Sequence, residues 1–185
     1  TDEIYEHILY DGREHVSIGS LDGMQERTIT IGSFSKTYSV TGWRVGNAVA
    51  DRALTGPIRK IHDFLTVGAP APLQEACAAA LRLPDSYYRE LAESYDAKRK
   101  ILHSGLTKAG FRCRLPEGAY YILADISSFE MDDMAFAHHL VKNVGVAAVP
   151  GSSFFRDGGR HLLRFTFSKK DSTLAGACRR LEALG

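Results

Sequence analysis

The sequence predicts an α/β protein in two parts that are joined by a long helix. Three observations indicate this class. Short β-branched runs bounded by glycine, such as residues 28–32, are typical of strands. An uninterrupted helical pattern covers residues 85–109. Residues 110–185 then alternate strand and helix patterns, which is typical of a small α+β unit.

The composition is that of a globular protein. The 185 residues carry 23 Lys+Arg and 22 Asp+Glu, a formal net charge of +1, with 44% hydrophobic and 24% charged residues. Disorder, collagen and coiled coil are excluded by these values, and the near balance of charge argues against a nucleic-acid binder. No apolar run approaches the roughly 20 residues of a membrane span, and residues 1–3 do not resemble a signal peptide.

The cysteines and histidines show no spacing that is typical of a site. Three cysteines lie far apart with no CxxC pair, and no histidines have metal-ligand spacing. We therefore expect no metal, and reduced, buried thiols in a cytoplasmic protein that acts on small molecules.

Residues 28–32 and 44–50 are predicted to be two buried strands. The connection, residues 33–43, has no helical pattern and is too short for a parallel crossover, so the strands should pair antiparallel. A polar loop between them would lie at the edge of the sheet, where functional groups tend to sit. Helices are expected next, over residues 51–65 and about 72–82.

The strongest helical pattern, residues 85–109, has clear end signals. Asp85 follows Pro84 and is expected to be the N-cap, and Gly110 is the expected stop. At 1.5 Å per residue such a helix extends about 37 Å, enough to link two domains.

The remaining pattern predicts four strands and two helices. The strands are residues 111–114, 119–126, 145–149 and 162–167, and the helices are residues 131–144 and 171–184. Strand alternation places Arg164 on the face opposite Leu163 and Phe165. By the same alternation, one of Tyr120 and Tyr121 is expected in the core and the other in a cleft.

Residues 31–44 contain the highest density of side chains that could take part in binding or catalysis. This segment combines Lys36 and Arg44 with five Ser/Thr hydroxyls and two glycines, directly after a predicted strand. A lysine held at a sheet edge near a cation can serve as a nucleophilic amine. An arginine among hydroxyls suits a phosphate group. From composition alone, a solvated surface loop remains an equal alternative.

Five short segments, in this order, together resemble the class I/II aminotransferases, which are fold-type-I pyridoxal-phosphate (PLP) enzymes. They are residues 2–5 (DEIY), 33–46 (SFSKTY followed by TGWRVG), 116–121 (PEGAYY), 149–154 (VPGSSF) and 163–165 (LRF). The resemblance covers essentially the whole chain.

Three further segments are most similar to the kynurenine/glutamine/methionine aminotransferase branch. They are residues 70–76, 123–127 and 145–150. The prokaryotic aspartate aminotransferases are close behind.

The resemblance also implies a division of the chain. Residues 1–84 would be the C-terminal remainder of the PLP-binding large domain, residues 85–109 an interdomain helix, and residues 110–185 a small C-terminal α+β domain. In the family the DEIY segment lies past the middle of the chain. We therefore expect a C-terminal portion that, by itself, exposes sheet edges and an apolar face, binds PLP weakly and does not transaminate.

The resemblance assigns catalytic and cofactor roles to three residues. Lys36 would form the Schiff base with PLP and then move the proton at the substrate Cα. Asp2 would face the pyridine nitrogen and keep it protonated. Tyr5 would hydrogen-bond the phenolic oxygen. Without the resemblance, Asp2 and Tyr5 would be interpreted as fraying terminal residues.

The resemblance also assigns the anion contacts. Ser33 and Arg44 would bind the cofactor phosphate, with Ser35 adding a hydroxyl contact. Arg164 would bind the substrate α-carboxylate as a bidentate pair. By itself, Arg164 would be interpreted as an ordinary surface arginine.

The implied function is PLP-dependent transfer of an amino group from an L-amino acid to a 2-oxo acid, by a homodimer when full length. Two alternatives remain. One is another fold-type-I enzyme, a C–S β-lyase or a synthase, which would share Lys36, Asp2 and Arg44. The other is a non-catalytic domain of the same fold. The substrates stay unspecified, because the family builds its side-chain pocket largely from N-terminal residues and from the partner subunit.

Overall fold

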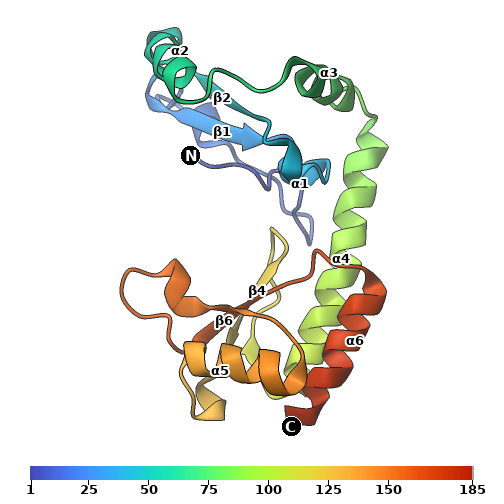
Figure 1. Cartoon of the computed structure of the whole chain (residues 1–185). Helices are drawn as coiled ribbons and strands as arrows, with labels where there is room; N and C mark the ends of the chain where they lie inside the picture. Colours follow the sequence, from blue (N-terminus) through green and yellow to red (C-terminus); the bar gives the residue numbers. More distant parts are fainter. Residues whose placement is uncertain (185) are drawn as a thin grey trace. The chain divides into compact units, whose positions relative to one another are not determined.

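The computed structural model describes residues 1–184 and is α/β, as predicted. It separates into two compact units, Thr1–Ala92 and Glu93–Gly185 (Figure 1). Helix α4 (Asp85–Lys108) contributes residues to both units. Each unit is described by itself.

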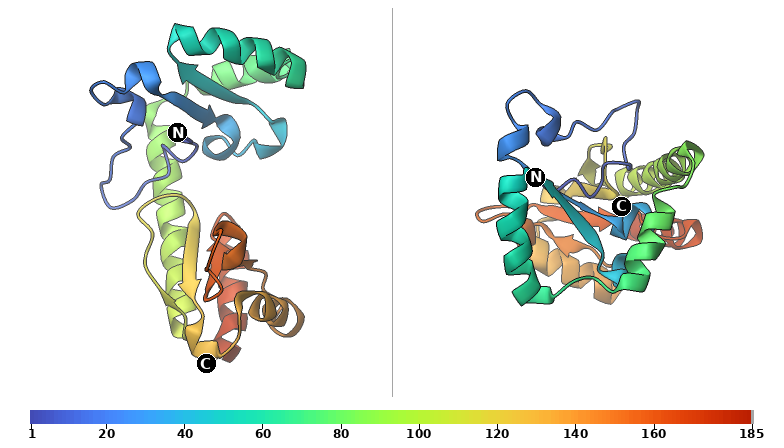
Figure 2. Two further views of the ribbon diagram at one scale, coloured as in Figure 1. Left: turned by 90° about the vertical axis from the view of Figure 1, so that its left-hand side faces the viewer. Right: turned by 90° about the horizontal axis from the view of Figure 1, so that it is seen from above.

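The first unit is built on a two-stranded antiparallel sheet, which confirms the predicted pairing. β1 (Ile29–Ser33) lies beside β2 (Gly46–Ala50) (Figure 2). The register of the two strands places Ser33 opposite Gly46. The N-terminal segment runs parallel to the other edge of β1. There the Glu3 N–H donates to the Ile31 carbonyl at 2.9 Å. This edge places Asp2 next to the strand that leads to Lys36.

The predicted burial of these two strands is wrong for the described residues. β2 is exposed from Gly46 to Val49, and β1 is at most half-buried. An apolar run in the sequence indicates that a strand tends to be buried. The strands stay exposed here because few side chains of residues 1–184 pack over them. The expected exposure of apolar side chains is confirmed for this unit: those of Ile31, Val49, Ile61, Phe64, Leu65 and Val67 are all exposed.

The connection between the strands, predicted to lack helix, contains two short helical turns. These are α1 (Phe34–Thr37) and the 3-10 turn η3 (Thr41–Trp43). A one-turn helix is too short to show a periodic pattern of apolar residues, so it could not be predicted from periodicity. Two further 3-10 turns precede β1: η1 (Ile18–Ser20) and η2 (Gln25–Arg27).

Two of the predicted helices follow β2 in the first unit. They are α2 (Arg52–Thr66) and α3 (Ala71–Ala80), close to the predicted ranges. The carboxylate of Asp51 caps α2 by accepting from the Ala53 N–H at 2.8 Å.

Helix α4 ends before Gly110, as predicted. It begins at Asp85, one residue earlier than a helix with Asp85 as its N-cap would begin. Asp85 is the first helical residue rather than the N-cap. At the other end Gly110 adopts φ 87°, its N–H donates to Thr107, and the Phe111 N–H donates to Leu106. This pair of bonds is a Schellman motif, and the positive φ explains why glycine stops the helix.

The second unit contains a four-stranded antiparallel sheet of order β3-β4-β6-β5. Its strands are β3 (Arg112–Cys113), β4 (Tyr121–Asp125), β5 (Val149–Pro150) and β6 (Leu162–Thr166). The predicted strand over residues 145–149 is therefore only two residues long and begins at Val149, because Gly145 takes a left-handed conformation and ends the preceding helix.

Helices cover one face of this sheet. α5 (Asp133–His139) continues as a π-helical turn, η5 (Leu140–Val144), and α6 (Asp171–Leu181) ends in the 3-10 turn η7 (Glu182–Leu184). The buried apolar side chains of the sheet are Ile122, Ala124, Leu163 and Phe165. α6 lies beside α4, where Gly105 contacts Cys178 (Figure 1).

Candidate functional site

Lys36 lies in α1, immediately after β1. Its side chain is half-buried, and its neighbours Ser35 and Thr37 are buried. Ser33 is the N-cap of α1, because its Oγ accepts from the Ser35 N–H at 3.1 Å. The end of a strand and a capped turn of helix therefore fix the backbone that carries the lysine.

Two hydroxyls meet at the start of α1. Ser33 Oγ lies 2.7 Å from Ser35 Oγ and 3.2 Å from the Val45 carbonyl oxygen. Arg44 lies at the same end of the sheet, because it comes two residues before Gly46, the partner of Ser33. The structure thus brings the three predicted phosphate contacts to one end of β1 and β2.

Arg44 has an unusual backbone for its residue type. Its φ is 57°, in the left-handed region, and its guanidinium donates to the Thr41 carbonyl at 3.0 Å. The side chain is exposed. A non-glycine residue in this region carries some strain, and such residues are common at functional sites.

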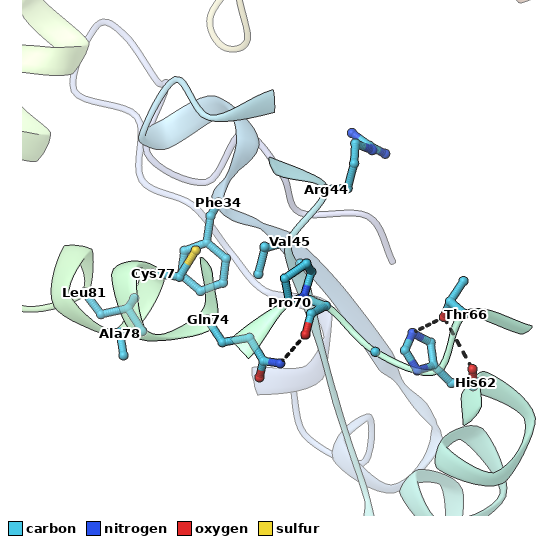
Figure 3. Close-up of a pocket in the computed structure, with 13 residues that line it drawn as sticks. Phe34, Arg44, Val45, His62, Thr66, Pro70, Gln74, Cys77, Ala78 and Leu81 are labelled. Atoms are coloured by element: carbon cyan, nitrogen blue, oxygen red, sulfur yellow. Dashed lines mark hydrogen bonds between the residues drawn. The ribbon is translucent and has the colours of Figure 1, made fainter. Parts of the chain in front are cut away.

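A pocket of about 630 Å³ lies beside Arg44, lined by residues from α1, β2, α2 and α3 (Figure 3). Gln74 donates to the Ala69 carbonyl at 2.6 Å in its wall. Arg44 is the only residue of the predicted site among those that line this pocket. The pocket therefore does not coincide with the position of Lys36.

Asp2 and Tyr5 occupy the N-terminal segment that flanks β1. Asp2 is exposed, and its Oδ1 accepts from the Ile4 N–H at 3.3 Å. Tyr5 is half-buried, and its carbonyl accepts from the Ile8 N–H at 2.9 Å. Neither residue is a fraying terminus, because the bridge to Ile31 holds the segment on the sheet.

Glu3 anchors this segment, and sequence reasoning missed it. The carboxylate is buried and bonds His15 at 2.8 Å, the Ser17 hydroxyl at 3.0 Å and the Ile18 N–H at 3.3 Å. Burial alone would raise the pKa of Glu3, but these hydrogen bonds outweigh it and hold the pKa below its ordinary value. Nothing in the sequence distinguishes Glu3 from its acidic neighbours.

An aromatic group behind α1 was also missed. The Tyr38 hydroxyl lies 2.7 Å from that of Tyr88, and the Tyr87 hydroxyl donates to the Thr37 carbonyl at 2.8 Å. Burial and the bond with Tyr88 raise the pKa of Tyr38 far above its ordinary value. The only sequence signal was the pair of adjacent tyrosines at the start of the long helix.

Arg164 belongs to the second unit, on the solvent-facing side of its sheet. Leu163 and Phe165 are buried on the other side, so the predicted alternation is confirmed. The guanidinium carbon lies 3.9 Å from the ring centre of Phe154 and 4.1 Å from that of Tyr121. An open pocket of about 890 Å³ adjoins these three residues.

The tyrosine pair of the PEGAYY segment separates as expected. Tyr120 is buried against Tyr95, with ring centres 5.6 Å apart, whereas Tyr121 is half-buried beside Arg164. The turn before them is held by Arg99, which is fully buried and donates to the Pro116 carbonyl at 2.6 Å.

Residues 1–184 contain neither a metal-ligand group nor a membrane-spanning helix. No group of three or more His, Cys, Asp or Glu side chains is arranged to hold a metal ion. No helix in this part of the chain combines the length and apolar character of a membrane span.

The first unit therefore carries an amine, a carboxylate, a phenol, two adjacent hydroxyls and a guanidinium on one strand and the segments that flank it. Such a set can hold an anionic ring compound by its phosphate, its ring nitrogen and an electrophilic carbon. The second unit carries a guanidinium suited to a carboxylate.

Comparison with known proteins gives concordant matches. The family described as "Aminotransferase class I and II" matches residues 1–181. The chain is 39% identical to the methionine aminotransferase of Escherichia coli (strain K12), covering 100% of this chain and 48% of that protein. It is 38% identical to a kynurenine–oxoglutarate transaminase of Dictyostelium discoideum, covering 96% and 46%.

Solved structures match equally well. N-succinyldiaminopimelate aminotransferase from Mycobacterium tuberculosis superposes with a TM-score of 0.94 at 41% identity, covering 100% of this chain and 49% of that one. The chain spans about half the length of the curated relatives it matches.

Proposed function

The chain belongs to the class I and II aminotransferases, and from this premise we propose that the protein transfers the amino group of an L-amino acid to a 2-oxo acid, with PLP as cofactor. The observation that carries the proposal is the placement of Lys36. The lysine follows a strand directly, on a capped turn, with two hydroxyls and Arg44 at the same end of the sheet.

The donor set fits PLP group by group. The amine of Lys36 suits an aldehyde, and the carboxylate of Asp2 suits a protonated pyridine nitrogen. The phenol of Tyr5 suits the phenolic oxygen of the ring. When bound, PLP supplies an aldehyde that can exchange amines and a ring that accepts an electron pair.

Lys36 would carry the chemistry. Its amine would hold the aldehyde carbon covalently until a substrate amine replaces it. The released Lys36 amine would then take the proton from the substrate Cα and return it as general acid. Its half-buried position, between buried Ser35 and Thr37, limits the orientations from which it can act.

Asp2 would keep the proton on the ring nitrogen by charge and hydrogen bonding. The β-bridge between Asp2 and Ile31 supports this role, because it fixes the backbone of Asp2 against β1, the strand that precedes Lys36. Tyr5 would donate a hydrogen bond to the phenolic oxygen from the same segment.

Ser33, Ser35 and Arg44 would bind the phosphate. The two serine hydroxyls are adjacent, 2.7 Å apart, and the guanidinium of Arg44 is exposed and donates to the Thr41 carbonyl at 3.0 Å. Charge-assisted hydrogen bonds to phosphate are about twice as strong as neutral ones.

Arg164 would bind the substrate α-carboxylate. The guanidinium carbon lies 3.9 Å from the ring centre of Phe154 and 4.1 Å from that of Tyr121, and these cation–π contacts restrain the planar fork that suits a carboxylate.

The names of the relatives guide the choice of substrates. They include kynurenine–oxoglutarate, methionine and N-succinyldiaminopimelate aminotransferases. We infer that the donor is among such amino acids and that 2-oxoglutarate is a suitable first acceptor to try. A cytoplasmic homodimer is the assembly that we propose for the protein.

An activity screen tests the proposal. The protein, together with whatever sequence precedes Thr1 in its native form, is incubated with PLP, 2-oxoglutarate and each of the three amino acids. We expect formation of glutamate with at least one donor, and loss of that activity in Lys36→Ala. A separate incubation with a cysteine S-conjugate, whose sulfur is on Cβ, tests the β-lyase alternative: cleavage of the Cβ–S bond with addition of water, giving pyruvate, ammonia and the thiol without glutamate, would indicate it.

A further inference from the structure

Side chains outside the predicted cofactor contacts hold the helix that carries Lys36. α1 has only four residues, and a helix of this length is not stable by itself. The last carbonyl groups of any helix lack partners within it. The groups that donate hydrogen bonds to these carbonyls therefore hold the backbone of Lys36 in place.

Two of the four carbonyls of α1 are satisfied by the backbone that follows. The Phe34 carbonyl accepts from the Tyr38 N–H at 3.2 Å, and the Lys36 carbonyl accepts from the Ser39 N–H at 3.4 Å. These bonds close the turn locally and do not connect it to another element.

The other two carbonyls accept from side chains. The Thr41 hydroxyl donates to the Ser35 carbonyl at 3.1 Å. The Tyr87 hydroxyl donates to the Thr37 carbonyl at 2.8 Å, across fifty positions of sequence. Thr37 is the last residue of α1 and directly follows Lys36, so this bond ties the lysine turn to the beginning of α4.

The Tyr87 ring is itself fixed by packing. It stacks on Tyr38 with ring centres 5.7 Å apart and planes inclined by 13°, and it meets Tyr88 edge-on at 5.5 Å. The Tyr38 and Tyr88 hydroxyls bond each other at 2.7 Å. These contacts keep the Tyr87 ring in the position from which its hydroxyl reaches the Thr37 carbonyl.

We propose that Tyr87 is a positioning residue for Lys36: its hydroxyl holds the Thr37 carbonyl and thereby sets the approach of the Lys36 amine to the cofactor aldehyde. This inference rests on the proposed function. Tyr87 acts through the backbone of α1. Its removal should therefore alter the reactivity of Lys36 more than the stability of the first unit.

Reductive trapping tests the inference. The Lys36 amine attacks the PLP aldehyde, a C–N bond forms, water leaves, and hydride from borohydride makes the bond permanent. Peptide mapping then gives the ratio of label on Lys36 to label on Lys60. Lys60 is an exposed lysine of α2 in the same unit and serves as internal reference.

We expect Tyr87→Phe, which keeps the ring and removes the hydroxyl, to lower this ratio roughly 2- to 10-fold, the equivalent of one neutral hydrogen bond. Tyr95→Phe is the matched control, since Tyr95 is on the same helix and packs in the second unit. The urea midpoint of Trp43 fluorescence shows whether Tyr87→Phe unfolds the first unit; a purely structural role would lower that midpoint and leave the ratio of the folded protein unchanged.

An unchanged ratio in folded Tyr87→Phe would overturn the inference, provided that the wild-type chain prefers Lys36. If the wild type shows no preference for Lys36, the proposed function fails instead. Should Tyr87→Phe not fold, Thr41→Val removes the other side-chain donor and leaves the rings intact. The ratio is again expected to fall, and no change would count against the inference.

Discussion

At the scale of single residues, the face of the strand on which Arg164 lies was predicted correctly, whereas its ring contacts were not. Alternation along its strand gave its face correctly, because a strand has a fixed period of two. The contacts of its guanidinium with the rings of Tyr121 and Phe154 were not predicted, since Phe154 comes from a separate turn. Contacts between segments distant in sequence are set by tertiary packing, on which local patterns carry no information.

Replacing Phe154 by leucine should weaken binding of the substrate carboxylate. Loss of one cation–π contact at a partly exposed site, about 0.5–1 kcal/mol, predicts that KM for the amino acid rises about 2- to 5-fold while kcat changes little. Phe155→Leu is the matched control, because the ring over the guanidinium is that of Phe154. Equal KM values for Phe154→Leu and wild type would show that the ring does not position Arg164.

Glu3 predicts a specific dependence of stability on pH. Its pKa is lowered in the folded state, so its contribution is present above the unfolded pKa and is lost as the pH falls through the folded pKa. The difference in urea midpoint between wild type and Glu3→Gln, followed by Trp43 fluorescence, should therefore be largest near pH 7 and shrink toward pH 3. A difference that stays constant from pH 7 to pH 3 would rule out this linkage.

At the scale of elements, the long helix α4 was predicted well and the short helix α1 was not. The helix at 85–109 was found to within a residue, because its apolar period and its terminal glycine agree. α1 was missed, although it carries Lys36, because its single turn depends on the Ser33 cap and on donors from Thr41 and Tyr87. The motif located the candidate site, whereas the conformation of the site depends on distant contacts.

The contact between α4 and α6 depends on a glycine. A Cβ at Gly105 would overlap the side chain of Cys178, so Gly105→Ala should lower the free energy of unfolding of the second unit by about 1–3 kcal/mol. A Cβ at Gly176, in α6, would make only an ordinary van der Waals contact, 4.0 Å from Nη2 of Arg179, so Gly176→Ala should be neutral or stabilising by about 0.5–1 kcal/mol. Urea unfolding followed by far-UV circular dichroism measures both. Equal stability of the two variants would contradict the tight contact.

At the scale of the whole molecule, the two units differ in how much apolar surface they bury. Within residues 1–184, the buried apolar side chains of the first unit are Ile8, Tyr10, Val45 and Cys77, and all the others belong to the second unit. The apolar composition predicted that the chain has a hydrophobic core, but not that most of this core lies in the second unit. The strands of the first unit look like core strands in sequence and are left uncovered in the described chain.

This difference predicts that the 185-residue chain unfolds in two steps. Hydrophobic burial is the main stabilising term, so the first unit should unfold at lower urea than the second. Trp43 is the only tryptophan and lies in the first unit. Its fluorescence should therefore change only in the first transition, whereas the far-UV circular dichroism, to which helices of both units contribute, should change in both. Coincident transitions would show that the two units unfold as one.

The site of covalent PLP attachment tests the central proposal most directly. The chain is treated with excess PLP and borohydride, once folded and once in urea, and the labelled peptides are mapped. We predict label concentrated on Lys36 in the folded chain and spread over the lysines in urea. The same spread of label in both conditions, or no label on Lys36, would contradict the assignment of Lys36 as the residue that holds the cofactor.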